Sequence, residues 1–217
     1  MMNHDISQSL PSRSIGTQDA ENSRIECIAN ELRRSCRIHE AESGTGKTTL
    51  KLSDAEAYAA ESYAKENNLW VPMERISDLG TPGMSGNENE LYVSDDIIFK
   101  VNNLMNTGSI IALLEKALMH NELFPETFYR LYGFTGFGGR SVYPILQQAL
   151  IKEAESAPQI AIDTFMAALG FEKEERPGRY TNGKYIVWDL FPRNVLRDKD
   201  GDLYVVDAEI KRINEVM

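Results

Sequence analysis

The sequence predicts an α+β fold that combines an antiparallel sheet with a few helices. Two apolar segments, 194–196 and 203–206, flank the polar turn Asp198-Lys199-Asp200-Gly201. An Asp-Gly turn between alternating apolar arms is typical of a β-hairpin. A second hairpin is expected where the strands 128–134 and 141–147 flank a Gly-Phe-Gly-Gly segment. Apolar residues repeat at helical spacing in four stretches: 20–39, 54–68, 109–122 and 157–171.

Composition and charge limit the classes of function. The 217 residues suffice for one well-buried domain or two small lobes that share a cleft. The net charge of -10 argues against nucleic acid as a partner, because such a surface needs clustered Lys and Arg. No apolar run approaches the ~20 residues of a membrane span, so no membrane partner is expected. Cys27 and Cys36 fall on opposite faces of one helix, and a reduced, cytoplasmic setting is the default.

Residues 1–50 are expected to form a partly disordered N-terminal extension with one helix, 20–39. The first residues are polar and Ser-rich and show no periodicity. Residues 43–49, Ser-Gly-Thr-Gly-Lys-Thr-Thr, resemble part of a Walker motif. However, Ala41 takes the place of the first glycine and no apolar strand precedes the segment. A flexible linker is therefore favoured over a phosphate loop.

The next unit, 51–147, begins with a helix that leads into strands. Ser53 and Glu56 match a capping box for this helix. Further strands are expected at 70–76, 90–93 and 97–101, ahead of the helix 109–122 and the second hairpin. The unit would then contain five strands and one main helix.

A glycine-rich stretch with Gly80, Gly83 and Gly86 precedes the strand 90–93. Glycines let a hairpin backbone approach phosphate oxygens closely, although an ordinary loop explains the same residues. The following strand carries Lys100 among apolar neighbours. A lysine in such a strand usually faces solvent, so the position of Lys100 alone does not indicate contact with a phosphate.

Residues 148–217 form the last unit, in which the strand 185–188 leads into a loop and the first hairpin. Three polar residues interrupt this apolar segment: Asp189, Asn194 five residues later, and Asp207 thirteen residues after that. Their side chains suit a hard divalent cation plus one carboxylate that can accept a proton. The alternative is that Asp189 caps a turn and Asp207 ends a strand.

This spacing resembles the catalytic loop, Asp-x-x-x-x-Asn, and the metal-binding Asp of the protein-kinase-like fold. The nearest match is the minimal kinase domain of polyvalent proteins of phages and conjugative elements. The resemblance implies two lobes, an upper one with an antiparallel five-stranded sheet and an abbreviated lower one. It also implies a cytoplasmic phosphotransferase of a mobile genetic element that uses ATP and Mg²⁺. Its acceptor would be a hydroxyl of an unknown protein or small molecule.

The resemblance further assigns roles to the three polar residues. Asp189 would be the catalytic base, and Asn194 and Asp207 would hold Mg²⁺. Lys100 would contact the nucleotide phosphates while a carboxylate of the helix 109–122 holds it. Glu115 lies in the middle of that helix beside its apolar stripe and is the first choice; Glu122 is the reserve.

The remaining nucleotide contacts also follow from the resemblance. The hairpin with Gly83 and Gly86 would cover the phosphates, although its spacing is not Gly-x-Gly-x-x-Gly. The segment 147–151, which begins with Gln147 and Gln148, would be the hinge whose backbone receives the adenine.

Several residues depart from the kinase pattern. Val187 stands where the family's catalytic loop begins with His, and Phe191 stands where many protein kinases have Lys. Asp207 is followed by Ala208 and Glu209 in place of Phe and Gly. Arg193 is a candidate for the missing positive charge near a transferring phosphoryl group. These departures and the short lower lobe keep a second reading open, that of a catalytically inactive, pseudokinase-like module that binds a nucleotide or a protein.

Overall fold

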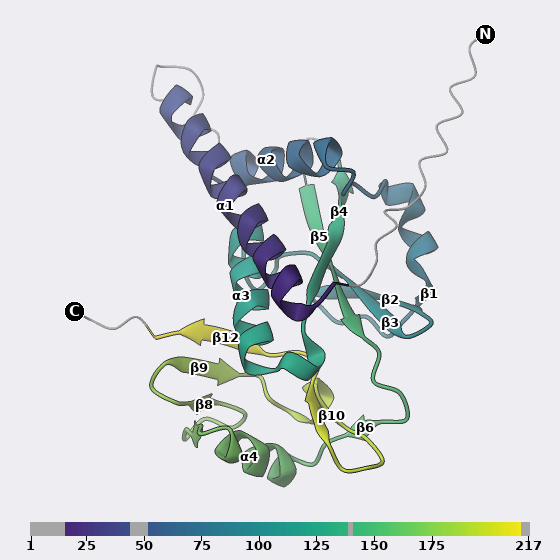
Figure 1. Cartoon of the computed structure of the whole chain (residues 1–217), viewed down its shortest axis with the longest axis vertical. Coiled ribbons are helices and arrows are strands. Elements are labelled where there is room, and N and C mark those ends of the chain that lie inside the picture. Colours follow the sequence, from purple (N-terminus) through teal and green to yellow (C-terminus); the bar gives the residue numbers. More distant parts are fainter. Residues whose placement is uncertain (1–15, 44–51, 139–140, 214–217) are drawn as a thin grey trace.

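A computed structural model describes residues 16–43, 52–138 and 141–213. Of the N-terminal residues expected to be disordered, up to about Asp19, residues 1–15 lie outside these ranges, whereas Gln18 and Asp19 belong to a helix. Most of the Walker-like segment, including Lys47, also lies outside these ranges. The described part is a mixed α+β structure with a five-stranded antiparallel sheet (Figure 1). None of its helices is both long and apolar enough to cross a membrane.

The large sheet has the strand order β1-β2-β3-β5-β4. Its strands are β1 (Thr81–Pro82), β2 (Asn89–Ser94), β3 (Ile97–Asn102), β4 (Arg130–Phe137) and β5 (Ser141–Ala149). In the central strand, Lys100 lies opposite Leu91 of β2 and Leu146 of β5. The predicted hairpin of β4 and β5 is confirmed. The strands expected at 90–93 and 97–101 are also present, as β2 and β3, and they pair with each other.

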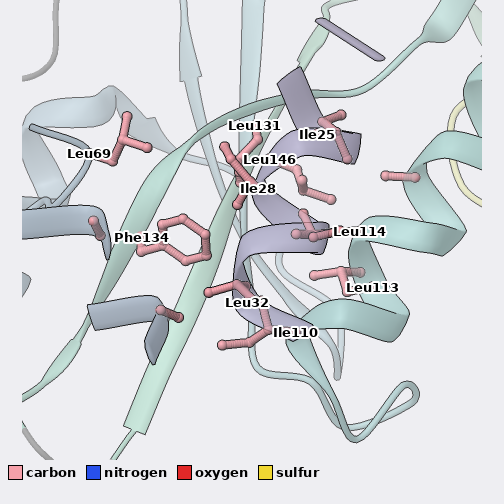
Figure 2. Close-up of a cluster of buried hydrophobic side chains, with 14 of the residues drawn as sticks. Ile25, Ile28, Leu32, Leu69, Ile110, Leu113, Leu114, Leu131, Phe134 and Leu146 are labelled. Atoms are coloured by element: carbon pink, nitrogen blue, oxygen red, sulfur yellow. The ribbon is translucent and has the colours of Figure 1, made fainter. Parts of the chain in front are cut away.

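Three helices pack together against this sheet. They are α1 (Gln18–Ser43), α2 (Leu52–Glu66) and α3 (Ile110–Leu123). Figure 2 shows the apolar stripe of α1, with Ile25, Ile28 and Leu32, beside Leu114 of α3 and Phe134 of β4. All five of these side chains are buried, so α1 belongs to the same hydrophobic core as the sheet.

The expected strand 70–76 is wrong. Only Trp70 forms an isolated bridge, with Phe134, and a 3₁₀ helix, η1 (Met73–Leu79), follows. Pro72 stands directly before η1 with a φ of -57°, and it has no N–H to offer a strand partner. The edge strand of the sheet is instead β1, which pairs with β2 across the glycine-rich segment.

The predicted capping box at Ser53 and Glu56 is also wrong. Because α2 begins at Leu52, Ser53 already lies inside the helix. The buried carboxylate of Glu56 accepts hydrogen bonds from the Ser109 hydroxyl at 2.8 Å and from the Ile111 N–H at 2.7 Å. Glu56 thus satisfies one of the free N–H groups at the start of α3, where a negative charge is favourable.

The rest of the chain, drawn below the large sheet in Figure 1, packs around a hydrophobic cluster of its own. It contains η2 (Pro125–Thr127), α4 (Gln159–Ala168), η3 (Pro192–Asn194) and two small sheets, β11-β10-β6 and β12-β9-β8-β7. Their strands are β6 (Glu155–Ser156), β7 (Glu172–Lys173), β8 (Tyr180–Thr181), β9 (Tyr185–Trp188), β10 (Val195–Arg197), β11 (Leu203–Val205) and β12 (Glu209–Arg212). Residues Ile162, Met166, Tyr180, Val187 and Val195 are among its buried core.

The predicted hairpin of β10 and β11 is confirmed, with Val195 opposite Val205. Two features were not expected. The charged stretch 172–183 contains the short hairpin of β7 and β8, and β12 follows Asp207 and pairs with β9. Consequently β12 lies beneath α3 and beside the segment that carries Asp189 (Figure 1).

Candidate functional site

Asp189 and Asn194 are fixed to each other in the loop after β9. The Asn194 amide nitrogen donates to the Asp189 carbonyl at 2.7 Å and to its carboxylate Oδ2 at 2.8 Å. Asp189 has a φ of 63°, a left-handed conformation that costs a non-glycine residue energy. The two Asn194 hydrogen bonds compensate for this cost, so the loop presents the Asp189 side chain in one defined place.

Arg193 makes the second contact to the Asp189 carboxylate. Its Nη2 lies 2.5 Å from Oδ1, and both side chains reach solvent. Each carboxylate oxygen therefore accepts one hydrogen bond and keeps a second acceptor site. Arg193 also lies over the ring of Phe191, with 5.0 Å between Cζ and the ring centroid. Its charge is thus placed by the Asp189 carboxylate and by this ring together.

Asp207 is brought to this loop by the backbone of Asn194. The Asn194 carbonyl accepts from the Val206 N–H at 2.9 Å and the Asp207 N–H at 3.4 Å. No described residue donates a hydrogen bond to the Asp207 carboxylate or to the Asn194 amide oxygen. The three polar residues singled out by their spacing thus meet at one end of the β10–β11 hairpin.

Lys100 reaches the same place from the large sheet and is 6% exposed, so it does not face solvent. Its amine donates to the Val206 carbonyl at 2.6 Å and to the Tyr129 hydroxyl at 3.1 Å. Burial lowers the pKa of Lys100, and the nearby Lys116 lowers it further, whereas the charges of Asp207 and Glu88 act to raise it.

The pairing of Lys100 with Glu115 is wrong, and so is the reserve pairing with Glu122. Glu115 lies on the side of α3 that faces α1 and forms an ion pair with Arg33 of that helix. Glu122 forms an ion pair with Lys184 at 2.6 Å and accepts a hydrogen bond from Tyr185. Successive helical residues differ by ~100° in direction, so the residue that α3 turns toward Lys100 is a neighbour of Glu115.

That neighbour is Lys116, which is 7% exposed. Its amine lies 2.8 Å from Oε1 of Glu209 in β12 and 3.9 Å from Oε2 of Glu88, just before β2. Although burial alone would lower it, the pKa of Lys116 is raised by the carboxylates of Asp207, Glu209 and Glu88. A narrow cavity is lined by Lys116, Lys100 and Asp207 together, so these three residues border one space.

The sequence analysis missed Lys116, Glu88, Glu209 and Tyr129. One signal was available: Lys116 lies three residues after Leu113, on the apolar stripe of its helix. A lysine there needs a buried acidic partner, but nothing in the sequence says which element supplies it.

In the glycine-rich hairpin, the N–H groups of Gly83 and Gly86 are used by backbone carbonyls. Gly83 donates to the Leu91 carbonyl at 2.8 Å and Gly86 donates to the Asn89 carbonyl at 3.1 Å. Gly80 has a φ of 148°, and a Cβ there would lie 2.3 Å from the Val93 carbonyl oxygen. Gly80 is therefore required for the close approach of the two strands.

Gln147 and Gln148 lie inside β5 and not in a hinge. Gln147 is opposite Phe99, and the buried Gln148 side chain donates to the Thr127 carbonyl. The chain leaves the sheet only after Ala149, where the Leu150 N–H donates to the Asp96 carbonyl at 2.8 Å. The expectation that Gln147 and Gln148 belong to a hinge is therefore wrong, because β5 is longer than predicted and ends at Ala149.

Within the described ranges, no three His, Cys, Asp or Glu side chains are grouped so as to hold a metal ion. The oxygen-rich set at Asn194 and Asp207 is of another kind, since it combines one amide with one carboxylate.

Comparison with known families agrees with this geometry. Residues 53–214 match the model of a family described as serine/threonine/tyrosine kinase found in polyvalent proteins. The match covers most of the chain and begins after α1. No curated protein matches the sequence.

Proposed function

Because the chain belongs to the family of serine/threonine/tyrosine kinases found in polyvalent proteins, we propose that it transfers a phosphoryl group from ATP, with Mg²⁺, to an acceptor hydroxyl. The observation that carries this proposal is the pair of hydrogen bonds from the Val206 and Asp207 N–H groups to the Asn194 carbonyl. They join the catalytic-loop residues to the metal-binding candidate beside Lys100. The hydrophobic clusters packed against the large sheet would then be the core of one lobe, and the cluster around α4 would be the core of the other.

The donor atoms at Asn194 and Asp207 fit Mg²⁺. The Asn194 amide nitrogen is used by Asp189, which leaves its oxygen for another contact. The Asp207 carboxylate accepts no hydrogen bond from a described residue, and hard oxygen ligands of this type suit Mg²⁺. The ion would supply positive charge that neutralises the phosphate oxygens.

Lys100 would contribute the second positive charge. Two of its three N–H donors are used by Val206 and Tyr129, and the third remains for a phosphate oxygen. The hairpin with Gly83 and Gly86 would cover the phosphates, and the segment that follows Gln147 and Gln148 would receive the adenine.

Asp189 would accept the proton of the acceptor hydroxyl. Its carboxylate keeps free acceptor sites, and Arg193 and Asn194 hold it in a single orientation. A fixed base of this kind acts mainly through geometry and contributes ~10²–10⁴-fold to the rate. The acceptor itself would be a protein or a small molecule with an accessible hydroxyl.

A second function is favoured by one observation. The amine of Lys100 donates to Val206 and Tyr129 and is not paired with a carboxylate of α3. The lysine of an active kinase is expected to have such a carboxylate partner. A pseudokinase-like module that binds nucleotide without transfer would be built in this way.

The experiment that tests the proposal uses the full chain with Mg²⁺ and γ-labelled ATP. We expect label transfer to the protein itself or to an added hydroxyl acceptor, and saturable Mg-ATP binding in a titration. Binding of Mg-ATP without transfer to any acceptor would support the pseudokinase-like module. Absence of Mg-ATP binding would contradict both functions.

A further inference from the structure

Helix α3 turns a lysine, not a carboxylate, toward Lys100. Lys116 and Lys100 line the same narrow cavity, and Asp207 completes that wall. Two buried cations near each other repel, so each needs an acidic partner to remain charged. Lys100 donates its two hydrogen bonds to uncharged groups, a carbonyl and a hydroxyl. Lys116, in contrast, forms a direct ion pair with a carboxylate.

The acid for Lys116 comes from β12, far along the chain. Glu209 lies 2.8 Å from the Lys116 amine and is only two residues after Asp207. The amide of Asn106 donates to the same Glu209 carboxylate at 3.0 Å and to Glu88 at 2.8 Å. One polar group therefore joins α3, the start of β2 and β12.

One buried oxygen atom of this group has no hydrogen-bond partner. The Glu88 Oε1 atom is buried and accepts no hydrogen bond, while Oε2 is 3.9 Å from Lys116. A buried carboxylate with an open oxygen is costly unless nearby cations stabilise it. Lys100 and Lys116 are those cations, so the charges of the group hold one another in place.

We propose that the Lys116–Glu209 ion pair positions Asp207 against Lys100. Helix α3 supplies the cation of this pair and β12 supplies the carboxylate. The pair anchors the start of β12 to the helix, and this fixes the backbone from Val206 to Glu209. Lys116 and Glu209 are positioning residues, since they act through Asp207 and Lys100. The inference rests on the proposed function in one respect, namely that Asp207 and Lys100 bind Mg-ATP.

The test is a double-mutant cycle on the full chain with Lys116→Met, Glu209→Gln and the two together. The measured quantities are the Kd for Mg-ATP and the urea midpoint of unfolding without ligand. Each single change should weaken Mg-ATP binding by about tenfold or more, and the double variant should be no weaker than the worse single one, because the residues act as one unit.

Two further variants separate positioning from simple stability. Lys116→Arg keeps the charge and should bind Mg-ATP within about threefold of the wild type. Glu115→Gln removes the ion pair with Arg33 of α1, on another side of the same helix, and its Mg-ATP affinity should equal that of the wild type. If a single variant does not fold, the neutral double variant and Lys116→Arg still carry the comparison.

The outcomes are distinct. Lower urea midpoints with unchanged Mg-ATP affinity in Lys116→Met and Glu209→Gln would overturn the positioning role while leaving the proposed function intact. Additive losses of affinity in the double variant would overturn it as well. Failure of the wild-type chain to bind Mg-ATP would overturn the proposed function first, and the positioning role with it.

Discussion

The amine of Lys100 lies 2.6 Å from the carbonyl oxygen of Val206, the residue directly before Asp207. The hydroxyl of Tyr129 donates to the same carbonyl at 2.9 Å. One backbone oxygen thus joins the central strand of the large sheet to the end of the β10–β11 hairpin. Because Lys100 lies in β3 and Asp207 follows β11, this carbonyl sets how close their charges come.

We expect Mg-ATP to raise the melting temperature of the wild-type protein and to do so far less for Asp207→Ala. A ligand that binds only the folded state stabilises it by about RT ln(1 + [L]/Kd). Thermal unfolding with and without Mg-ATP measures the effect. Asp202→Ala, an exposed position in the same hairpin, is the control and should keep the full shift. Equal shifts for the wild type and Asp207→Ala would remove Asp207 from the metal site.

Lys100→Ala should weaken nucleotide binding, whereas Lys47→Ala should leave it unchanged. Lys100 is buried beside Asp207, but Lys47 belongs to the Walker-like segment that no apolar strand precedes. A titration with Mg-ATP compares the two variants. The reverse order of affinities would mean that the phosphate-binding lysine is Lys47.

Gly80→Ala should lower the free energy of unfolding by about 1–3 kcal/mol, because the site combines a φ of 148° with a Cβ position 2.3 Å from the Val93 carbonyl oxygen. Gly86→Ala is the matched control, since no atom lies within 4 Å of its Cβ position. Urea unfolding gives both values. A cost at Gly86 as large as that at Gly80 would contradict the close approach of β1 and β2.

His120 should make stability depend on pH. It is fully buried beside Tyr129, and burial and the charge of Lys100 lower its pKa from 6.5 to about 3. The unfolded chain binds the proton first as pH falls, so the folded state loses stability from about pH 6.5 downward, by up to about 1.4 kcal/mol per pH unit.

His120→Gln should remove this part of the dependence. Urea unfolding of both proteins between pH 7 and pH 5 measures the slope. A slope for His120→Gln that equals the wild-type slope would show that His120 is not the group responsible.

The parts of the fold predicted from the sequence are those encoded by local signals. The Asp-Gly turn and its apolar arms define the β10–β11 hairpin, and the apolar spacing defines α1 and α3. The strand expected at 70–76 is wrong because the chain enters a 3₁₀ helix after Pro72. Val71, before the helix, and Ile76, within it, pack in the same hydrophobic cluster as Phe99 of β3. Local pattern alone does not distinguish these two ways of burying the same residues.

In the candidate site, too, the residues that are close in sequence could be predicted, and those from distant elements could not. Asp189, Asn194 and Asp207 lie within one short stretch of chain, so their spacing predicts that they meet. Lys116 and its acidic partner Glu209 come from distant elements, and only tertiary packing brings them together. The choice of Glu115 failed because α1 covers that face of α3, where Arg33 takes the carboxylate. No helical periodicity reveals which face a second helix will cover.

The most direct test of the central claim is phosphoryl transfer by Asp189→Asn, measured beside its Mg-ATP affinity. Asp189 touches neither Asp207 nor Lys100 in the described structure and is held by Arg193 and Asn194. The account predicts that Asp189→Asn loses transfer by ~10²–10⁴-fold or more while its Kd for Mg-ATP stays near the wild-type value. Asp200→Asn, an exposed turn residue, is the control and should retain both. Transfer at the wild-type rate by Asp189→Asn, or a wild-type protein that binds Mg-ATP and transfers to no hydroxyl, would contradict the account.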